Sequence, residues 1–219
     1  MAETVSPELH TPVADRVSAV PDILVALREA TAPYHQRIDD ALRLTTPAVT
    51  SETLRHLLRR CYGLYEPLET RLTAMARPVP VLAQLVAARR KLPLIGADLH
   101  ALGDSAETIA RLPRCGIGPL ALTTPALFGT LYVTETATLG GHFVARHLER
   151  SLGLSRGHGY SFFQSYGGDA IGRMWRLLAA QLWAYDTPAT REGVIEGAVE
   201  TFRTIERWLI PKTGEDHDA

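Results

Sequence analysis

The chain has 219 residues, 46% of them hydrophobic, so it can bury the core of one domain, and long disorder is excluded. Its 23 Lys and Arg residues balance 24 Asp and Glu residues, and the net charge of −1 argues against binding nucleic acid or an anionic membrane surface. No stretch of ~20 apolar residues is free of charge or proline, and the N-terminus lacks the pattern of a secretion signal. Cys61 and Cys115 have no partner at metal-ligand spacing, which indicates a reducing compartment. We expect a cytoplasmic protein.

Residues 1–21 mix prolines with acids and small polar residues without periodicity, as in a flexible leader, and residues 211–219 form a C-terminal tail. Between them, apolar residues three to four positions apart predict helices at 22–42, 51–75, 81–102, 120–152, 170–185 and 189–209. Asp22 and Ser51 are the expected N-caps of the first two, and Pro93 is a kink or join in the third. Residues 104–118 look like a connection, and residues 153–168 look like turns around a short helix. Because no alternating strand pattern occurs, we expect an all-α, single-domain, multi-helix bundle over residues 22–210.

Three glycines, Gly129, Gly140 and Gly141, interrupt the helical pattern of residues 120–152. Each weakens a helix by roughly 1 kcal/mol relative to Ala, so each is either a packing point or a place where the helix closely approaches something. The segment Thr136–Gly141 is a candidate site, because adjacent glycines leave one face bare and a flat ligand can reach the backbone there. Close packing of two helices is the alternative.

His35 is the histidine whose setting favours a ligand role. It lies beside the apolar stripe of the first helix, with Thr31 one turn before it and Asp39 one turn after it. A carboxylate one turn away on the same helix face can orient an imidazole. A structural histidine is the alternative, since a lone histidine on a helix usually has no ligand.

These features together resemble the heme oxygenase family. Leu27–His35 (LREATAPYH) resembles the proximal helix of that family, in which the heme-ligating histidine follows an Ala-Thr pair. Leu131–Gly141 (LYVTETATLGG) resembles the distal helix, especially that of the enzymes associated with bacteriophytochromes. Two further stretches, 162–175 and 187–202, resemble the segments that follow in the same subgroup. The resemblance runs in consistent order from about residue 22 to residue 209.

The resemblance implies an oxidoreductase that binds heme between two helices and cleaves it to biliverdin, carbon monoxide and ferrous iron. Dioxygen and electrons from a reductase or a ferredoxin are implied as co-reactants, and a bacteriophytochrome is implied as the acceptor of the bilin. His35 would bind the iron, Asp39 would orient His35, and Arg28 would pair with a heme propionate, a solvent-exposed Arg28 being the alternative. The implied heme-binding residues are Arg28, Thr31, His35, Asp39, Tyr132, Arg173 and Arg176, and the implied catalytic positions are Thr136, Ala137, Gly140 and Gly141.

The chain departs from the family pattern at two of these positions. Thr136 stands where the family has a glycine, and Ala137 stands where it has a small polar or acidic residue. The side chain of Ala137 cannot take part in proton delivery, which would pass through Thr136, Thr138, water or the backbone. A heme-binding or heme-sensing protein with weak or no turnover is therefore the alternative function. A helical interaction protein without heme, or another cofactor-processing enzyme of similar architecture, is a more distant one.

Overall fold

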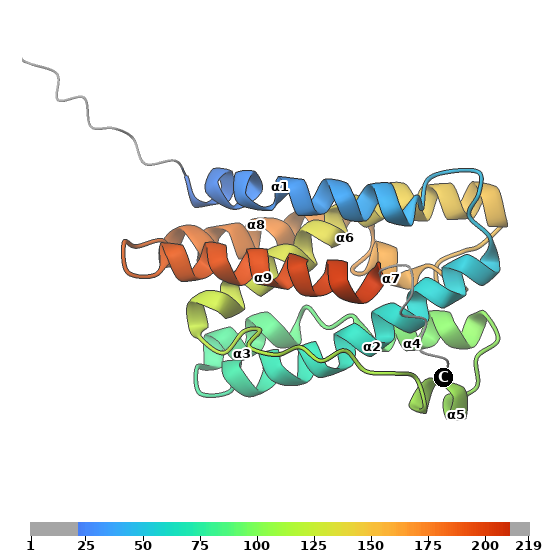
Figure 1. Ribbon diagram of the computed structural model, residues 1–219, viewed down its shortest axis with the longest axis horizontal. Coiled ribbons are helices and arrows are strands. Elements are labelled where there is room, and N and C mark those ends of the chain that lie inside the picture. The colour runs from blue at the N-terminus through green and yellow to red at the C-terminus, as the bar shows by residue number, and fades with distance from the viewer. Residues whose placement is uncertain (1–21, 211–219) are drawn as a thin grey trace, which may run out of the picture.

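The computed structural model describes residues 22–210, and this part of the chain is all-α (Figure 1). No β-strand occurs within it, so the expected fold class is confirmed. The predicted leader and tail lie outside the described residues. The helices are α1 (Ile23–Leu42), α2 (Ser51–Ala76), α3 (Pro80–Ala87), α4 (Leu92–Ala101), α5 (Ala106–Ala110), α6 (Thr124–Leu152), α7 (Ser161–Gln164), α8 (Gly168–Tyr185) and α9 (Arg191–Leu209).

One of the two expected N-caps is confirmed. The Asp22 carboxylate accepts a hydrogen bond from the Leu24 N–H at 2.7 Å at the start of α1. The expectation for Ser51 is wrong, because Thr50 caps α2. Its hydroxyl accepts from the Thr53 N–H while the Thr53 hydroxyl accepts from the Thr50 N–H, so the cap lies one residue earlier.

The predicted helix at 81–102 is two helices, α3 and α4, separated by residues 88–91. Pro93 lies in the first turn of α4, where its missing N–H costs no helical hydrogen bond. The segment 104–118 contains the short helix α5, which the sequence did not indicate. The break between α3 and α4 places Arg89 and Lys91 inside the molecule, and both side chains are buried.

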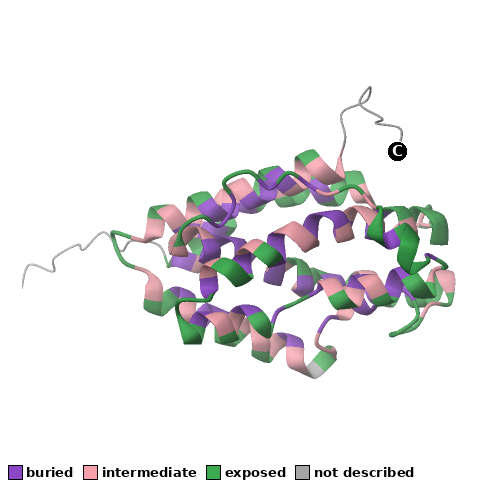
Figure 2. Ribbon diagram, turned by 90° about the horizontal axis from the view of Figure 1, so that it is seen from below, coloured by how far each residue is buried: buried purple, intermediate pink, exposed green. Residues whose placement is uncertain are grey.

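Close packing of α6 against α9 organises the bundle. A Cβ added at Gly129 would lie 2.2 Å from the Val194 carbonyl oxygen, so only glycine allows this approach. In Figure 1, α1 and α9 lie side by side above α2 and α4, and α6 crosses behind them. Figure 2 shows that buried residues alternate with exposed ones along the helices, and the buried hydrophobic residues of these helices form one core cluster.

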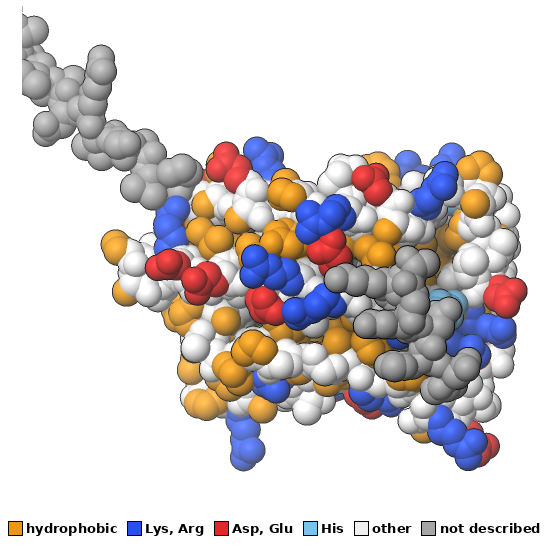
Figure 3. Space-filling view, in the orientation of Figure 1, with side chains coloured by type: hydrophobic (Ala, Val, Ile, Leu, Met, Phe, Trp, Pro, Cys, Tyr) orange, Lys and Arg blue, Asp and Glu red, His pale blue; other side chains and the backbone are white. Residues whose placement is uncertain are grey.

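The surface drawn in Figure 3 carries charges of both signs, in line with the nearly equal numbers of basic and acidic residues in the sequence. On the face drawn in Figure 3, basic and acidic side chains stand next to each other. Arg37 of α1 and Glu206 of α9 form one ion pair between two helices. That face therefore carries no extended field of one sign.

Among the described helices, none is long and apolar enough to cross a membrane.

Candidate heme site

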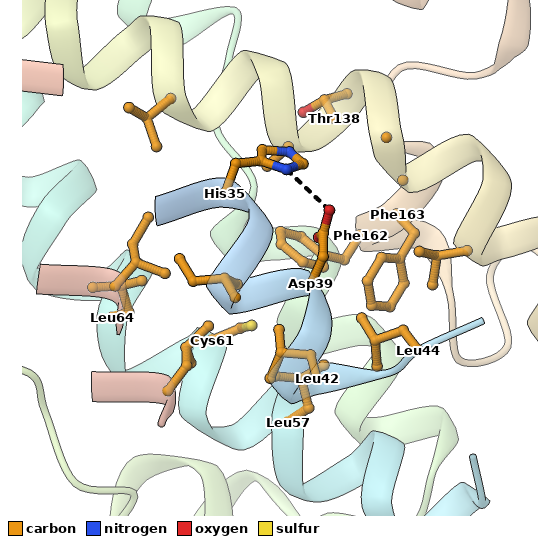
Figure 4. Close-up of a pocket in the computed structure, with 18 of the residues that line it drawn as sticks. His35, Asp39, Leu42, Leu44, Leu57, Cys61, Leu64, Thr138, Phe162 and Phe163 are labelled. Carbon is orange, nitrogen blue, oxygen red and sulfur yellow. Dashed lines mark ion pairs between the residues drawn. The ribbon is translucent and has the colours of Figure 1, made fainter. Parts of the chain in front are cut away.

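His35 and Asp39 form a pair on α1. The Nδ1 atom of His35 lies 2.9 Å from a carboxylate oxygen of Asp39, and the His35 side chain is 48% exposed. A carboxylate at Nδ1 holds the proton on that nitrogen and leaves the lone pair of Nε2 available to a metal. Figure 4 shows both side chains facing the cavity, with Thr138 of α6 across from His35. The predicted relation between these two residues is present.

His35 lines two cavities. The first has a volume of about 400 Å³ and lies between α1, α2, α6, α7 and α9. Its walls are mainly apolar, with aliphatic side chains from α1 and α2 and aromatic side chains from α7, among them Leu42, Leu57, Leu64, Phe162 and Phe163. Asp39 lines this cavity beside His35. Such walls suit a flat apolar ligand held by few polar contacts.

The second cavity, of about 570 Å³, lies on the other side of His35, between α1, α6, α8 and α9. Arg28, Thr31 and Tyr132 line it. Burial raises the pKa of Tyr132, while a hydrogen bond with Thr31 and the charge of Arg28 act in the opposite direction. This cavity therefore offers a cation and a phenol to a ligand, close to the imidazole.

The two adjacent glycines of α6 have different roles. A Cβ at Gly140 would meet no atom within 4 Å, and Gly140 lines the first cavity. A Cβ at Gly141 would lie 2.3 Å from the carbonyl oxygen of Phe163 in α7. Gly141 and Gly129 are thus packing points, whereas Gly140 leaves the helix backbone bare towards the cavity. The packing interpretation is confirmed at Gly129 and Gly141, and the approach of a flat ligand at Gly140 stays a prediction.

Residues 136–138 of α6 offer no free side-chain donor to the first cavity. The Thr136 hydroxyl donates to the carbonyls of Tyr132 and Val133, at 3.0 and 2.9 Å, and Thr136 lines the second cavity. The Thr138 hydroxyl donates to the Thr134 carbonyl at 3.1 Å. Ala137 lines the first cavity with a methyl group only.

Arg173 and Arg176 are exposed on α8, and neither lines the two cavities. Trp175, between them in sequence, lines the second cavity, and its ring centroid lies 5.9 Å from that of Tyr132. The role of Arg173 and Arg176 towards a propionate remains a prediction.

Two cavity-lining residues of α2, Cys61 and Tyr65, were not singled out by the sequence. Only their place in an apolar stripe could have indicated them. Burial raises the pKa of Cys61 to about 12, so its thiol stays protonated at neutral pH.

The residues around His35 fit heme better than a free metal ion. No group of three or more His, Cys, Asp or Glu residues that could hold a metal occurs among residues 22–210. A single histidine is a sufficient protein ligand when a porphyrin supplies the other donors. The bare backbone at Gly140 and the flat aromatic walls leave space for such a macrocycle.

Comparisons with known proteins show the family to which the chain belongs. The family model described as heme oxygenase matches residues 22–210. The chain belongs to the heme oxygenase family. A heme oxygenase of Xanthomonas campestris pv. campestris (strain 8004) is 30% identical over 156 residues, which cover 70% of this chain and 87% of that protein.

Two solved structures of heme oxygenases have a similar fold. The NO- and CO-bound heme oxygenase from Neisseria meningitidis aligns with a TM-score of 0.68 at 20% identity, covering 87% of this chain and 91% of that one. Heme oxygenase-1 from the cyanobacterium Synechocystis sp. PCC6803 in complex with heme aligns with a TM-score of 0.69 at 17% identity, covering 86% and 91%. At these identities the two structures support the fold alone.

Proposed function

We propose that this protein is an enzyme that cleaves heme to biliverdin, carbon monoxide and ferrous iron, using dioxygen and external electrons. The observation that carries the proposal is the position of His35. Its ring lies between two cavities, is oriented by Asp39, and faces α6, where Gly140 has a bare backbone. Membership of the heme oxygenase family supports the same conclusion.

In this proposal His35 binds the heme iron through Nε2, and Asp39 keeps the ring in the orientation that binding requires. The apolar walls of the first cavity bury the macrocycle. Arg28, in the second cavity, pairs with a propionate beside Tyr132. Bound heme supplies the iron that activates dioxygen and is itself the substrate.

On the side of α6, the protein leaves space for the bound heme and offers it no hydrogen bond from a side chain. Gly140 keeps a strip of backbone open, and the methyl group of Ala137 lines the same cavity. Because the hydroxyls of Thr136 and Thr138 donate to helix carbonyls, protons must come from water or from more distant groups.

The test starts with anaerobic addition of hemin, which should give a Soret band that His35→Ala changes and His56→Ala does not. His56 is an exposed histidine of α2 that lines neither cavity, so it is the matched control. Reductant and oxygen should then convert the heme to a bilin. Hemin that stays intact after prolonged turnover would contradict the proposed reaction.

The second candidate function, a heme-binding or heme-sensing protein with weak turnover, is favoured by Ala137, which gives the cavity no polar group. The double variant Thr136→Gly with Ala137→Ser separates the two candidates. If the wild type forms no bilin and the double variant does, the result supports the heme-binding or heme-sensing function. If the wild type already forms bilin, the reason to propose that function is removed.

Three finer expectations belong to the same proposal. They are a reductase or ferredoxin as electron donor, a bacteriophytochrome as bilin acceptor, and a cytoplasmic location. Each remains a prediction from the sequence. Reconstitution with a ferredoxin and its reductase, followed by chromatography of the bilin, checks the first.

A further inference from the structure

One exposed aromatic side chain lies at the edge of the first cavity. Among the large apolar side chains of residues 22–210 that are exposed, Phe143 of α6 has the highest exposure, 67%, and it is the one that lines the first cavity. A single exposed apolar residue is common on protein surfaces and by itself indicates nothing. Phe143 is different, because a ligand that fills the apolar cavity beside it can cover the ring and remove it from water.

Phe143 belongs to a strip of α6 that faces the first cavity. Ala137, Gly140 and Phe143 are three residues apart, so they follow one side of the helix. All three are exposed, and all three line the first cavity. Ala137 offers only a methyl group, and Gly140 has no side chain. Phe143 is therefore the residue of this strip whose side chain is large enough to extend over a ligand.

The space next to the Phe143 ring is open. Long side chains on a helix lean towards its N-terminus, over the turn that precedes them. For Phe143 that turn contains Gly140, where an added Cβ would meet no atom within 4 Å. The ring packs edge-on against His142, with the ring centroids 5.8 Å apart. Because exposed side chains change rotamer within nanoseconds, Phe143 can turn over a ligand without any change in the backbone.

The two cavities suit opposite edges of a heme. Heme carries two propionates on one edge and two vinyl groups on the opposite half of the ring. No Lys or Arg among residues 22–210 lines the first cavity, and the carboxylate of Asp39, which does line it, disfavours a second carboxylate there. Arg28 lines the second cavity and offers a partner to a propionate. The apolar walls of the first cavity match the vinyl groups instead.

We propose that Phe143 covers the vinyl-bearing edge of heme and thereby selects heme over porphyrins that lack vinyl groups. This inference rests on the proposed function, and it adds a residue that sets how long heme stays bound. Val144, the next residue of α6, and Leu44, after the end of α1, line the same cavity. The vinyl groups therefore meet apolar side chains from two segments, with the Phe143 ring closing over them.

The first test measures how fast hemin leaves the protein, without turnover. Dissociated hemin is captured by an excess of apomyoglobin, and the change in the Soret band gives the rate. Phe143→Ala should release hemin about 10-fold faster than the wild type, whereas Phe143→Leu, which keeps an apolar side chain, should recover most of the difference. Leu122→Ala is the matched control, because Leu122 is 53% exposed and lines neither cavity.

The second test determines whether Phe143 contacts the vinyl groups themselves. Deuterohemin has hydrogen atoms in place of both vinyl groups and keeps both propionates. The wild type should release deuterohemin about 10-fold faster than hemin, whereas Phe143→Ala should release the two at similar rates. A general loosening of the cavity would raise both rates by the same factor. Loss of the preference for hemin therefore reports a contact between the ring and the vinyl groups.

Hemin dimethyl ester checks the direction of the heme, since its propionates carry no charge. Arg28→Ala should lose the preference for hemin over the ester, and Phe143→Ala should keep it. If Phe143→Ala loses the preference over the ester, or keeps the preference over deuterohemin, the proposal is overturned, and a wild type that still forms bilin leaves the oxygenase standing. A wild type that releases all three porphyrins as expected but leaves heme intact during turnover contradicts the oxygenase alone. A wild type that binds no hemin contradicts both.

Discussion

Gly141 of α6 packs directly on the backbone of Phe163 in α7. A Cβ at position 141 would lie 2.3 Å from the Phe163 carbonyl oxygen, and backbone atoms cannot move away as the end of a flexible side chain can. The contact fixes α7, whose aromatic side chains form a wall of the first cavity, against the helix that crosses that cavity. The distance between the two walls is thereby set by a residue without a side chain.

Gly141→Ala should therefore destabilise the protein by about 1–3 kcal/mol, the usual range for overpacking a tight contact. The measurement is the midpoint of urea unfolding, converted with the slope of the transition. A stability equal to that of the wild type would show that α7 can shift without cost.

Gly140→Ala is expected to act in the opposite way on stability. Its Cβ meets no atom within 4 Å, so the change should stabilise α6 by up to about 1 kcal/mol through helix propensity alone. The added methyl group enters the first cavity, so hemin should bind more weakly. Parallel unfolding curves and hemin titrations check both, and an unchanged hemin affinity would place the macrocycle away from Gly140.

The local features of the site could be predicted because they depend on spacing within one helix. His35 and Asp39 are four residues apart, and any helix over this stretch places them on one face. The cap at Asp22 depends on two neighbouring residues in the same way. The roles of the α6 glycines could not be predicted in this way. Each glycine lowers the stability of a helix by a similar free energy, and only the element packed against it determines whether it is a packing point or leaves an open face.

The residues missed by the sequence are those whose direction depends on packing between helices. Arg173 and Trp175 are two positions apart within one turn of α8, but Trp175 lines the second cavity whereas Arg173 is exposed. A sequence alignment that is shifted by one or two positions therefore assigns a cavity role to the wrong one of these residues. The buried contacts among Glu135, Lys91 and Tyr166 join residues up to 75 positions apart, and no local pattern relates Lys91 to Tyr166. Contacts between residues that are distant in sequence could be identified only once the fold was known.

Asp39→Asn tests how His35 is oriented. The amide oxygen can still accept from Nδ1–H but without a charge, so hemin affinity should fall about 10-fold, as for other groups that orient a metal-binding histidine. Asp40→Asn is the control, because Asp40 is exposed and accepts from Gln36 instead. Titration of the Soret band measures both variants, and equal affinities would show that His35 needs no partner to bind the iron.

The Asp104 carboxylate makes folding stability depend on pH. Two hydrogen bonds from Arg59 lower the pKa of Asp104, and its side chain is buried. A lowered pKa in the folded state contributes stability that is fully present above the ordinary value of about 4 and is lost as the pH falls through the folded pKa. The wild type should therefore lose stability steeply below about pH 4, while Asp104→Asn should be less stable at pH 7 and lose less on acidification. Thermal unfolding between neutral and acidic pH measures the difference between the two proteins. A constant difference across that range would show that Arg59 and Asp104 contribute through packing rather than through charge.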